Sequence, residues 1–288
     1  MLGRKGWTAV GLVALVMGVF LAVSWPRGLD VSLSTGPGPT SAPITLPEPT
    51  SEPEVLNEFP PAPPTTEPPL VDVARGPGRT LRVGTARPVP LPATVADARG
   101  PEIPIFSAPG DAEPGDWMDN PTWEGLPVVF LVMGRQGDWL NVQVSMRPNM
   151  ATAWVRAGDV TTRQVNQRIE IDIAARQLTV YDTKGKLFDA PVAPGLSSAP
   201  TPTGSFFVDG VVALSDTSGP YGAYQISVAA FSNVHYSFGG GNGQIAIHGT
   251  NNPALIGSPA SNGCVRMTNE DISQVTTMVP LGAPVQIY

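Results

Sequence analysis

The stretch "IAIHGTNNPALIGSPASNGCVRM", from Ile245 to Met267, contains the residues on which the interpretation of this chain depends. Its start alternates as a strand does, so that Ile245 and Ile247 point to one face and His248 to the other. Cys264, the only cysteine among 288 residues, follows His248 by sixteen positions. The intervening loop is rich in Gly, Pro and Asn, and it can fold back to bring the two side chains together.

A cysteine beside a histidine is a candidate catalytic pair. The thiolate is the reactive form, and the imidazole removes its proton or stabilises it as an ion pair. Gly249 leaves the main chain beside His248 open, so a carbonyl there could orient the ring. Gly263 lets the backbone approach a substrate carbonyl, and its N–H and that of Cys264 could form an oxyanion hole.

Other interpretations of the lone thiol remain open at this stage. A cysteine and a histidine at this spacing can be a coincidence, and a single cysteine can be an idle buried thiol or form an intermolecular disulfide. A zinc site is disfavoured because the region lacks the further Cys or His ligands that such a site needs. No metal and no cofactor is therefore expected.

Composition and charge restrict the class of protein. Charged residues make up only 14% of the chain, and the net charge is -7. This acidic balance gives no attraction to nucleic acid, and no basic stripe interleaved with aromatic residues is present. Nucleic-acid binding is therefore not expected.

The N-terminus predicts a membrane anchor. Residues 7–25 carry no charge and have about the length that crosses a bilayer, and Arg4 and Lys5 precede them. We therefore expect a cytoplasmic tail at residues 1–6, a transmembrane helix at 7–25 and the rest of the chain outside the cytoplasm. The alternative is a signal peptide cleaved near Ala22–Ser24. Both interpretations export the remainder.

Two regions follow the predicted anchor before the last block of the chain. Residues 26–92 hold many of the 33 prolines and few large apolar residues, which predicts a disordered, extended linker. Residues 93–163 read as short strands with a hairpin turn at 134–138. The stretch "GDWLNVQVSMRPNMATAWV" resembles a bacterial SH3-like barrel, which implies a module that binds wall peptides or a spacer that packs on the next domain.

Residues 166–288 predict a mostly-β domain with one short helix. Strand patterns occur in "RIEIDIAARQLTVYDTKGKLFDAPV", "GSFFVDGVVAL", "AYQISVA", "QIAIHG" and "APVQIY". In "TNEDISQVTTMV", Thr268 or Asn269 can cap a helix that ends at Pro280. The overall fold class is thus mostly β, after a transmembrane helix and a disordered linker.

The motif around Cys264 resembles the signature of the YkuD-type L,D-transpeptidases. That signature is a His, a loop, and then Ser/Thr-His-Gly-Cys followed by an apolar residue and Arg or Asn. The stretches "PTPTGSFFV", "GPYGAYQISVAAFS" and "PLGAPVQI" also resemble family segments in the expected order. One position departs, because Asn262 stands where the family has His, and Asn cannot carry a proton or a positive charge.

The resemblance implies a β-sandwich that transfers acyl groups between peptidoglycan stem peptides. Cys264 would attack the third residue of a tetrapeptide donor, His248 would act as base, and Gly249, Gly263 and Cys264 would supply main-chain groups. The thioester would pass to an amine of a second stem, which gives a 3→3 cross-link, or to water. Carbapenem-type β-lactams would acylate Cys264.

Roles for the neighbouring residues stay open. Arg266 is expected to bind a substrate carboxylate or to form an internal salt bridge, and Ser261 to line the pocket or to close the turn. Asn262 would shape the pocket, and His235 is expected to be structural.

Two rival functions are weighed beside the transpeptidase. One is a peptidoglycan-binding protein of the same fold in which Asn262 marks lost activity. The other is an enzyme that attaches stems to a protein amine.

Overall fold

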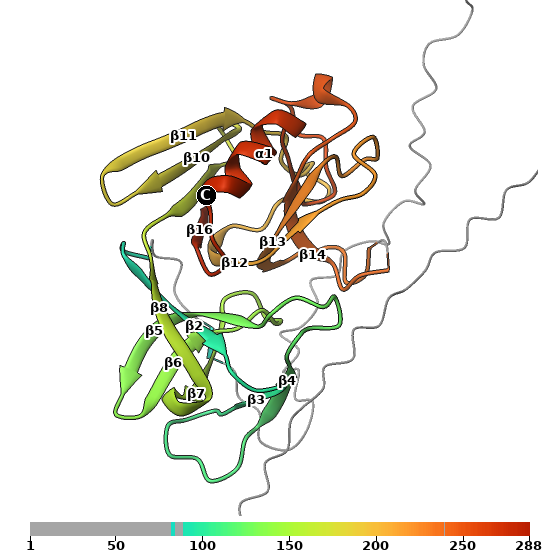
Figure 1. Ribbon diagram of the computed structural model, residues 1–288. Helices are drawn as coiled ribbons and strands as arrows, with labels where there is room; N and C mark the ends of the chain where they lie inside the picture. Colours follow the sequence, from blue (N-terminus) through green and yellow to red (C-terminus); the bar gives the residue numbers. More distant parts are fainter. Residues whose placement is uncertain (1–81, 84–88, 239) are drawn as a thin grey trace, which may run out of the picture. The chain divides into compact units, whose positions relative to one another are not determined.

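The computed structural model describes residues 82–83, 89–238 and 240–288. The predicted cytoplasmic tail and membrane anchor, and nearly all of the predicted linker, lie outside these residues. Within the described ranges, no helix is long and apolar enough to cross a membrane. Figure 1 shows the arrangement of the elements.

The first part of the described chain forms an antiparallel sheet with the strand order β1-β7-β6-β5-β2-β8. A separate hairpin, β3–β4, bridges to β7 through Phe106 and Trp154. The SH3-like identity of residues 93–163 stays a prediction. The strands are β1 (Arg82–Val83), β2 (Ala93–Ala98), β3 (Glu102–Ile105), β4 (Asp116–Asp119), β5 (Val129–Gln136), β6 (Trp139–Gln143), β7 (Ala151–Arg156) and β8 (Val160–Val165).

The second part forms an eight-stranded sheet with the order β11-β10-β9-β16-β12-β13-β14-β15. Two pairs are parallel, β16 with β9 and β14 with β15, and the others are antiparallel. The mostly-β prediction is confirmed. Its strands are β9 (Arg168–Asp172), β10 (Gln177–Asp182), β11 (Gly185–Pro191), β12 (Gly204–Ala213), β13 (Tyr224–Phe231), β14 (Gln244–His248), β15 (Val265–Arg266) and β16 (Pro284–Ile287).

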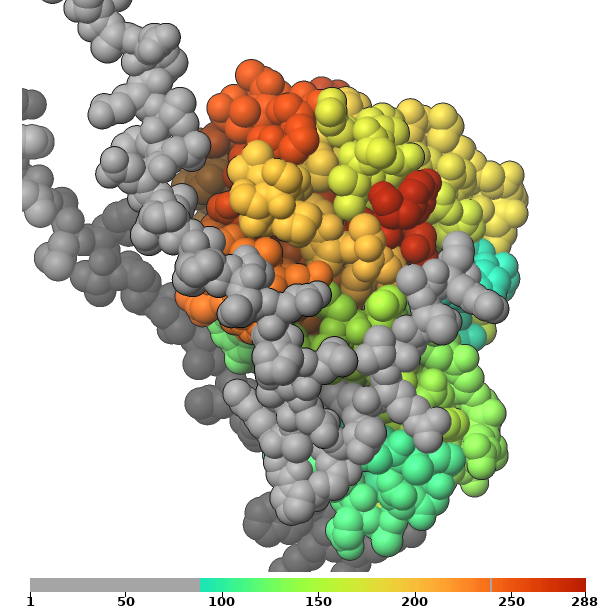
Figure 2. Space-filling model, turned by 180° about the vertical axis from the view of Figure 1, so that it is seen from behind, coloured from blue at the N-terminus to red at the C-terminus, as the bar shows by residue number. Residues whose placement is uncertain are grey.

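The α-helix α1 (Asn269–Met278) is the helix predicted from the sequence. Thr268 is its N-cap, and its side chain accepts a hydrogen bond from the Asp271 N–H at 3.0 Å, which satisfies one of the free donors of the first turn. Ile272 and Val275 are buried where the helix packs on β13 and β14 (Figure 1). The last residue, Tyr288, is 54% exposed. Part of the C-terminal segment, coloured red, is visible at the surface in Figure 2.

The hairpin turn predicted at residues 134–138 is tighter than expected, and the β10–β11 turn is equally short. The β5–β6 turn consists of Gly137 and Asp138, because β5 continues to Gln136, and Gly137 has a φ of 57°. The β10–β11 turn consists of Thr183 and Lys184. Strand pairing thus extends further toward both turns than the alternation of apolar residues indicated.

The described residues form two hydrophobic clusters, one of which includes side chains from both sheets. In the first sheet, side chains alternate between two clusters: Phe130 packs within the sheet's own cluster, whereas Leu131 packs against the second region. Val95 does the same from β2, and a Cβ placed on Gly282 would lie 2.5 Å from it. The first sheet is therefore buried on both faces, and one of these faces is the contact with the second sheet.

The β6–β7 loop docks on the second sheet by hydrogen bonds. Asn149 donates to the Phe231 carbonyl at 2.8 Å and accepts from the Phe231 N–H at 2.7 Å. Arg147 donates to the carbonyls of Ser232 and His235 at 2.8 and 3.2 Å. These bonds attach the first sheet to the segment that follows β13.

Candidate active site

His248 ends β14 and is buried, with 3% of its surface exposed. Its Nδ1 lies 2.6 Å from the carbonyl oxygen of Gly249. Because a carbonyl only accepts, Nδ1 carries the proton, and Nε2 of the neutral ring is then an acceptor. The Tyr221 ring packs on the imidazole with 4.7 Å between centroids. The predicted carbonyl of Gly249 thus fixes the tautomer that a general base needs.

The environment of His248 keeps the imidazole neutral. The pKa of His248 is lowered to about 4, mainly by burial and to a smaller extent by the charge of Arg266, while the hydrogen bond to Gly249 opposes the shift. At neutral pH the ring therefore carries no charge and can accept a proton from a thiol.

Cys264 is placed by the short parallel strand β15. The register pairs Ile247 with Val265 and His248 with Arg266. Residues in register point to the same face of a sheet, and faces alternate along each strand. Cys264, Ala246, His248 and Arg266 therefore share one face, with the cysteine beside Ala246 and diagonal to the histidine. The structure brings the predicted pair together.

The Cys264 thiol is protonated in this environment. Burial raises its pKa, and a backbone hydrogen bond with Ala246 and the charge of Arg266 act against the rise. The side chain is nevertheless partly exposed, because it lines a cavity of about 260 Å³. The resting pair is thus a neutral thiol beside a neutral imidazole, and the thiolate forms on proton transfer.

The cavity at Cys264 is built by several segments of the chain. Ser227 from β13 and Ala246 from β14 face into it, and Tyr221 and Phe238 come from the loops on either side of β13. Trp123, from the loop between β4 and β5, also lines it. The region that precedes the second sheet thus contributes to the wall of the cavity, which the sequence did not predict.

The turn before Cys264 is held by Ser261. The Ser261 hydroxyl donates to the Cys264 carbonyl and accepts from the Gly263 N–H at 3.1 Å. Ser261 itself is buried and does not line the cavity, so of its two predicted roles the structure favours closing the turn. Gly263 has a φ of 118°, which only glycine adopts readily.

This turn changes the predicted oxyanion hole. The Gly263 N–H already donates to Ser261, so it is not free for a substrate oxygen. Within residues 89–238 and 240–288, no hydrogen bond is made by the Cys264 N–H. Of the two predicted donors, the structure leaves that of Cys264 available.

Arg266 and Asn262 flank the pair differently. Arg266 is half-buried on the face of His248 and Cys264, and its Nε is buried without a hydrogen-bond partner among the described residues. No salt bridge to Arg266 occurs within those residues, so the internal ion pair considered for it is not formed there. Asn262 is also half-buried and is not among the residues that line the cavity.

His235 lies apart from the pair. Its ring packs 6.0 Å from that of Phe238, and it does not line the cavity at Cys264. Its backbone N–H donates to the Ser232 hydroxyl at 2.9 Å. The position is that of a structural residue. In the described part of the chain, no group of three or more His, Cys, Asp or Glu could hold a metal ion.

Asn269 supports the site and was missed as a functional residue. Its Oδ1 accepts from the N–H groups of Ala223 and Thr250 at 3.3 and 3.1 Å. A Cβ on Gly222 or Gly249 would lie 1.9 or 2.1 Å from that oxygen, so both glycines are needed for the approach. The sequence analysis singled out Gly249, but it did not show that Gly222 and Gly249 both lie against the side chain of Asn269.

The site thus combines a histidine of fixed tautomer with the single cysteine of the chain, in a mostly-β domain. Residues 166–287 match the family model of YkuD, the L,D-transpeptidase catalytic domain. A protein of Bacillus licheniformis named YkuD is 33% identical over 145 residues, which cover 50% of this chain and 77% of that protein. The chain therefore belongs to the YkuD family of L,D-transpeptidases.

Two further similarities extend the comparison. The YkuD protein of Bacillus subtilis is 37% identical over 119 residues, and the match spans 41% of this chain and 64% of that protein. A solved L,D-transpeptidase from Mycobacterium smegmatis is 15% identical, with a TM-score of 0.36 over 57% of this chain and 91% of that one. The family assignment rests on the family model and the sequence relatives.

Proposed function

We propose that this chain is a peptidoglycan L,D-transpeptidase that forms 3→3 cross-links through a Cys264 thioester. The observation that carries the proposal is the 2.6 Å contact of His248 Nδ1 with the Gly249 carbonyl, on the sheet face that also bears Cys264. The contact leaves Nε2 as the acceptor nitrogen of the ring, and the register places the partly exposed Cys264 thiol on the same face of the sheet. Membership of the family supplies the substrate class.

The first half-reaction acylates the cysteine. His248 Nε2 takes the thiol proton, and the sulfur attacks the carbonyl carbon of the third residue of a tetrapeptide stem. The Cys264 N–H stabilises the resulting oxyanion. The bond to the terminal D-Ala then breaks, His248 returns the proton to the leaving amine, and a thioester remains.

The second half-reaction transfers the acyl group. An amine of a neighbouring stem attacks the thioester carbonyl, His248 removes the proton of that amine, and the thiol is regenerated when the proton returns to sulfur. Water in place of the amine gives hydrolysis, and a protein amine would attach the stem to a protein. Arg266, cationic and adjacent to the pair, is proposed to bind a carboxylate of the stem.

Export of the catalytic region is part of the proposal. Residues 7–25 would anchor the chain in the membrane with the N-terminus in the cytoplasm, and the linker at 26–92 would hold the catalytic region in the cell wall. Covalent labelling of intact cells from outside, with Cys264→Ala as the control, tests this orientation.

Intact-mass spectrometry of the full-length chain tests the chemistry. Incubation with a tetrapeptide stem should add the mass of the peptide less D-Ala, and a carbapenem-type β-lactam should also form an adduct. Cys264→Ala should form neither, and His248→Gln should slow acylation roughly 10²–10⁴-fold. His235→Gln, the matched control, should acylate at the wild-type rate.

Two results would overturn the proposal. One is an unmodified thiol in folded protein at excess of both reagents, which would leave a peptidoglycan-binding protein as the better interpretation. The other is an adduct that survives in Cys264→Ala.

A further inference from the structure

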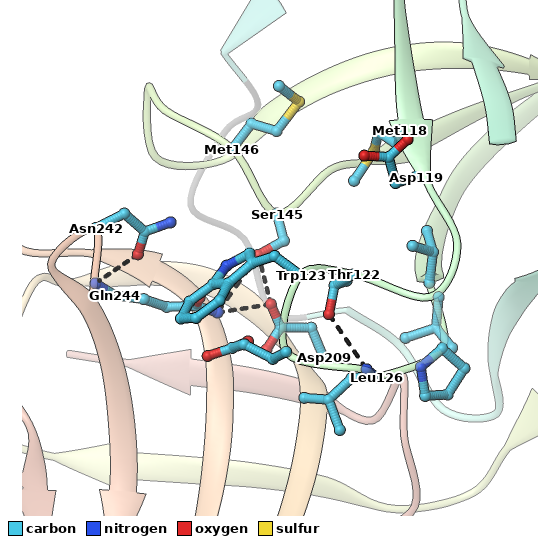
Figure 3. Close-up of a pocket in the computed structure, with 14 residues that line it drawn as sticks. Met118, Asp119, Thr122, Trp123, Leu126, Ser145, Met146, Asp209, Asn242 and Gln244 are labelled. Carbon is cyan, nitrogen blue, oxygen red and sulfur yellow. Dashed lines mark hydrogen bonds between the residues drawn. The ribbon is translucent and has the colours of Figure 1, made fainter. Parts of the chain in front are cut away.

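A second cavity, of about 270 Å³, lies against the same sheet as the Cys264 cavity. One side of it comes from β12 and β14, through Asp209 and Gln244. The other comes from the first sheet, through Ser145 and the loop after β4 that holds Trp123 and Glu124. Figure 3 shows Asp209 amid Ser145, Trp123 and Leu126, with the hydrogen bonds to its carboxyl drawn.

The lining combines acidic groups with apolar walls. Asp119, Glu124 and Asp209 all line the cavity, and no Lys, Arg or His is present among the described residues that do so. Trp123, which is 77% exposed, and Leu126 supply apolar surface. Such a lining suits an aliphatic chain that ends in a positive charge, because the carboxylates attract the cation and an indole face also binds it.

Asp209 is incompletely satisfied. Its Oδ2 accepts hydrogen bonds from the Ser145 hydroxyl and, at 2.7 Å, from Gln244 Nε2. Its Oδ1 is buried and has no hydrogen-bond partner in the described part of the chain. A buried carboxylate oxygen without a donor is costly, so a group that brings N–H donors and positive charge would complete it.

Glu124 adds a second carboxyl group to the cavity that contains Asp209. The pKa of Asp209 is raised to about 6, mainly by burial and least by the charge of Glu124, while the hydrogen bonds to its carboxyl oppose the rise. A cation between the two carboxylates would remove this repulsion. The surrounding side chains that contact the Asp209 carboxyl, Ser145 and Gln244, carry no charge of their own.

The two cavities share part of their lining. Trp123, Glu124, Asn242 and Gln244 line both of them. Gln244 and Ala246 lie on one face of β14, two residues or about 7 Å apart, and Cys264 lies beside Ala246. This spacing is comparable to the reach of a four- or five-atom aliphatic side chain.

We propose that the cavity formed by Asp209, Glu124 and Trp123 binds the side-chain ammonium of a diamino acid in the peptide that acylates Cys264. The inference rests on the proposed function and names a determinant of its donor specificity. An ammonium held by carboxylates is protonated and cannot attack the thioester, so this group positions the donor and does not react.

Donor selectivity tests the proposal on the full-length chain. Tetrapeptide donors with a free and with an N-acetylated side-chain amine are compared by the rate of adduct formation. The wild type should prefer the free amine by about tenfold or more. Asp209→Asn should reduce that preference to near one while the acetylated donor reacts as before, and Asp189→Asn, a remote and exposed carboxylate, should keep it.

A binding measurement separates this proposal from the catalytic one. In Cys264→Ala with ¹⁵N-labelled tryptophan, N-acetyl-lysine methylamide should shift the Trp123 indole signal in a saturable manner, and the neutral norleucine analogue should not. The shift should be lost in Asp209→Asn. Failure of acylation by every donor would reject the proposed function alone.

Three outcomes would overturn the ammonium site. These are equal rates for the two donors in the wild type, an unchanged preference in Asp209→Asn, and equal shifts with lysine and norleucine probes. A preference for the amine that appears only in the second, acyl-accepting step would assign the cavity to the acceptor and reject the donor assignment.

Discussion

At the scale of single residues, the reactivity of Cys264 depends on two opposite pKa shifts. Burial lowers the pKa of His248 to about 4 and raises that of the Cys264 thiol. An ion pair would require the imidazole to hold its proton more tightly than the thiol does, and the order here is the reverse. The pair is therefore neutral over the physiological range, unlike an ion-paired cysteine with a depressed pKa.

This state predicts the pH dependence of thiol alkylation. Between about pH 6 and about pH 9, the rate with iodoacetamide should climb steadily with pH, close to tenfold per unit, because the thiolate fraction rises in that proportion. Mass spectrometry of the alkylated protein measures the rate, and Cys264→Ala provides the background. A plateau at neutral pH would show a preformed thiolate and would contradict the neutral pair.

A second residue-scale prediction concerns Asn269. Asn269→Ala removes the acceptor shared by the Ala223 and Thr250 N–H groups. We expect a loss of about 1–3 kcal/mol in unfolding free energy, since two donors lose their partner. Acylation should slow by about tenfold, because the backbone at Ala223 and at Thr250, which lies near His248, loses the hydrogen bonds that hold it in place.

Asn252→Ala is the matched control for Asn269. The Asn252 side chain makes no capping hydrogen bond, and the residue is exposed. Denaturant unfolding and adduct kinetics should both match the wild type for this variant. Equal behaviour of the two variants would show that Asn269 does not support the site.

At the scale of elements, the loop between β6 and β7 orders the segment after β13. Arg147 donates to carbonyls of Ser232, His235 and Asn242, and its guanidinium packs 5.1 Å from the Phe231 ring and 4.7 Å from that of Tyr236. The planar guanidinium of arginine can make all of these contacts at once, whereas the ammonium group of lysine cannot. The same segment supplies Phe238 to the cavity at Cys264.

Arg147→Lys is therefore expected to loosen this segment. Amide hydrogen exchange in residues 232–238 and 240–243 should speed up by about tenfold, which corresponds to about 1.4 kcal/mol of local opening free energy. Exchange in β9 and β10 should not change. Arg156→Lys, which alters a cation–π contact with Phe106 in the first sheet, is the control. Unchanged exchange in the segment would refute the role of the guanidinium.

At the scale of the whole molecule, one hydrophobic cluster joins the two sheets, and we expect them to unfold together. The cluster that holds Val95 and Leu131 of the first sheet also holds Ile169, Phe206 and Val285 of the second. Separating the two sheets would expose this apolar surface to water. The first sheet also has a cluster of its own, so the predicted boundary between 163 and 166 separates two regions that share one cluster.

Calorimetry tests this cooperativity. The chain should show a single unfolding transition for both sheets, and Leu131→Ala should lower its stability by about 2–5 kcal/mol through the cavity that it leaves. Leu187→Ala, at a side chain that is 45% exposed, should change stability by about 0.5 kcal/mol or less. Two resolved transitions, with only one shifted by Leu131→Ala, would contradict a shared core.

The sequence by itself determined most of the strands, the helix and the choice of His248 and Cys264 as the candidate pair. These features follow from local rules: alternation for β14, a capping residue for α1, and a motif that joins His248 to Cys264. Membership of the YkuD family follows from the same residues. The proposed chemistry could be inferred without distant contacts, because His248 and Cys264 lie within about 20 positions of one another in the chain.

Only the tertiary structure decided what surrounds the pair. The Gly263 N–H is taken by Ser261, Asn269 joins two loops beside His248, and Trp123 reaches the Cys264 cavity from the region that precedes the second sheet. Asp209 acquires its unpartnered oxygen only when Ser145 and Gln244 meet around it. Such contacts depend on how separate segments pack, and hydrophobic periodicity specifies which face of a strand is buried but not which side chain lies against it.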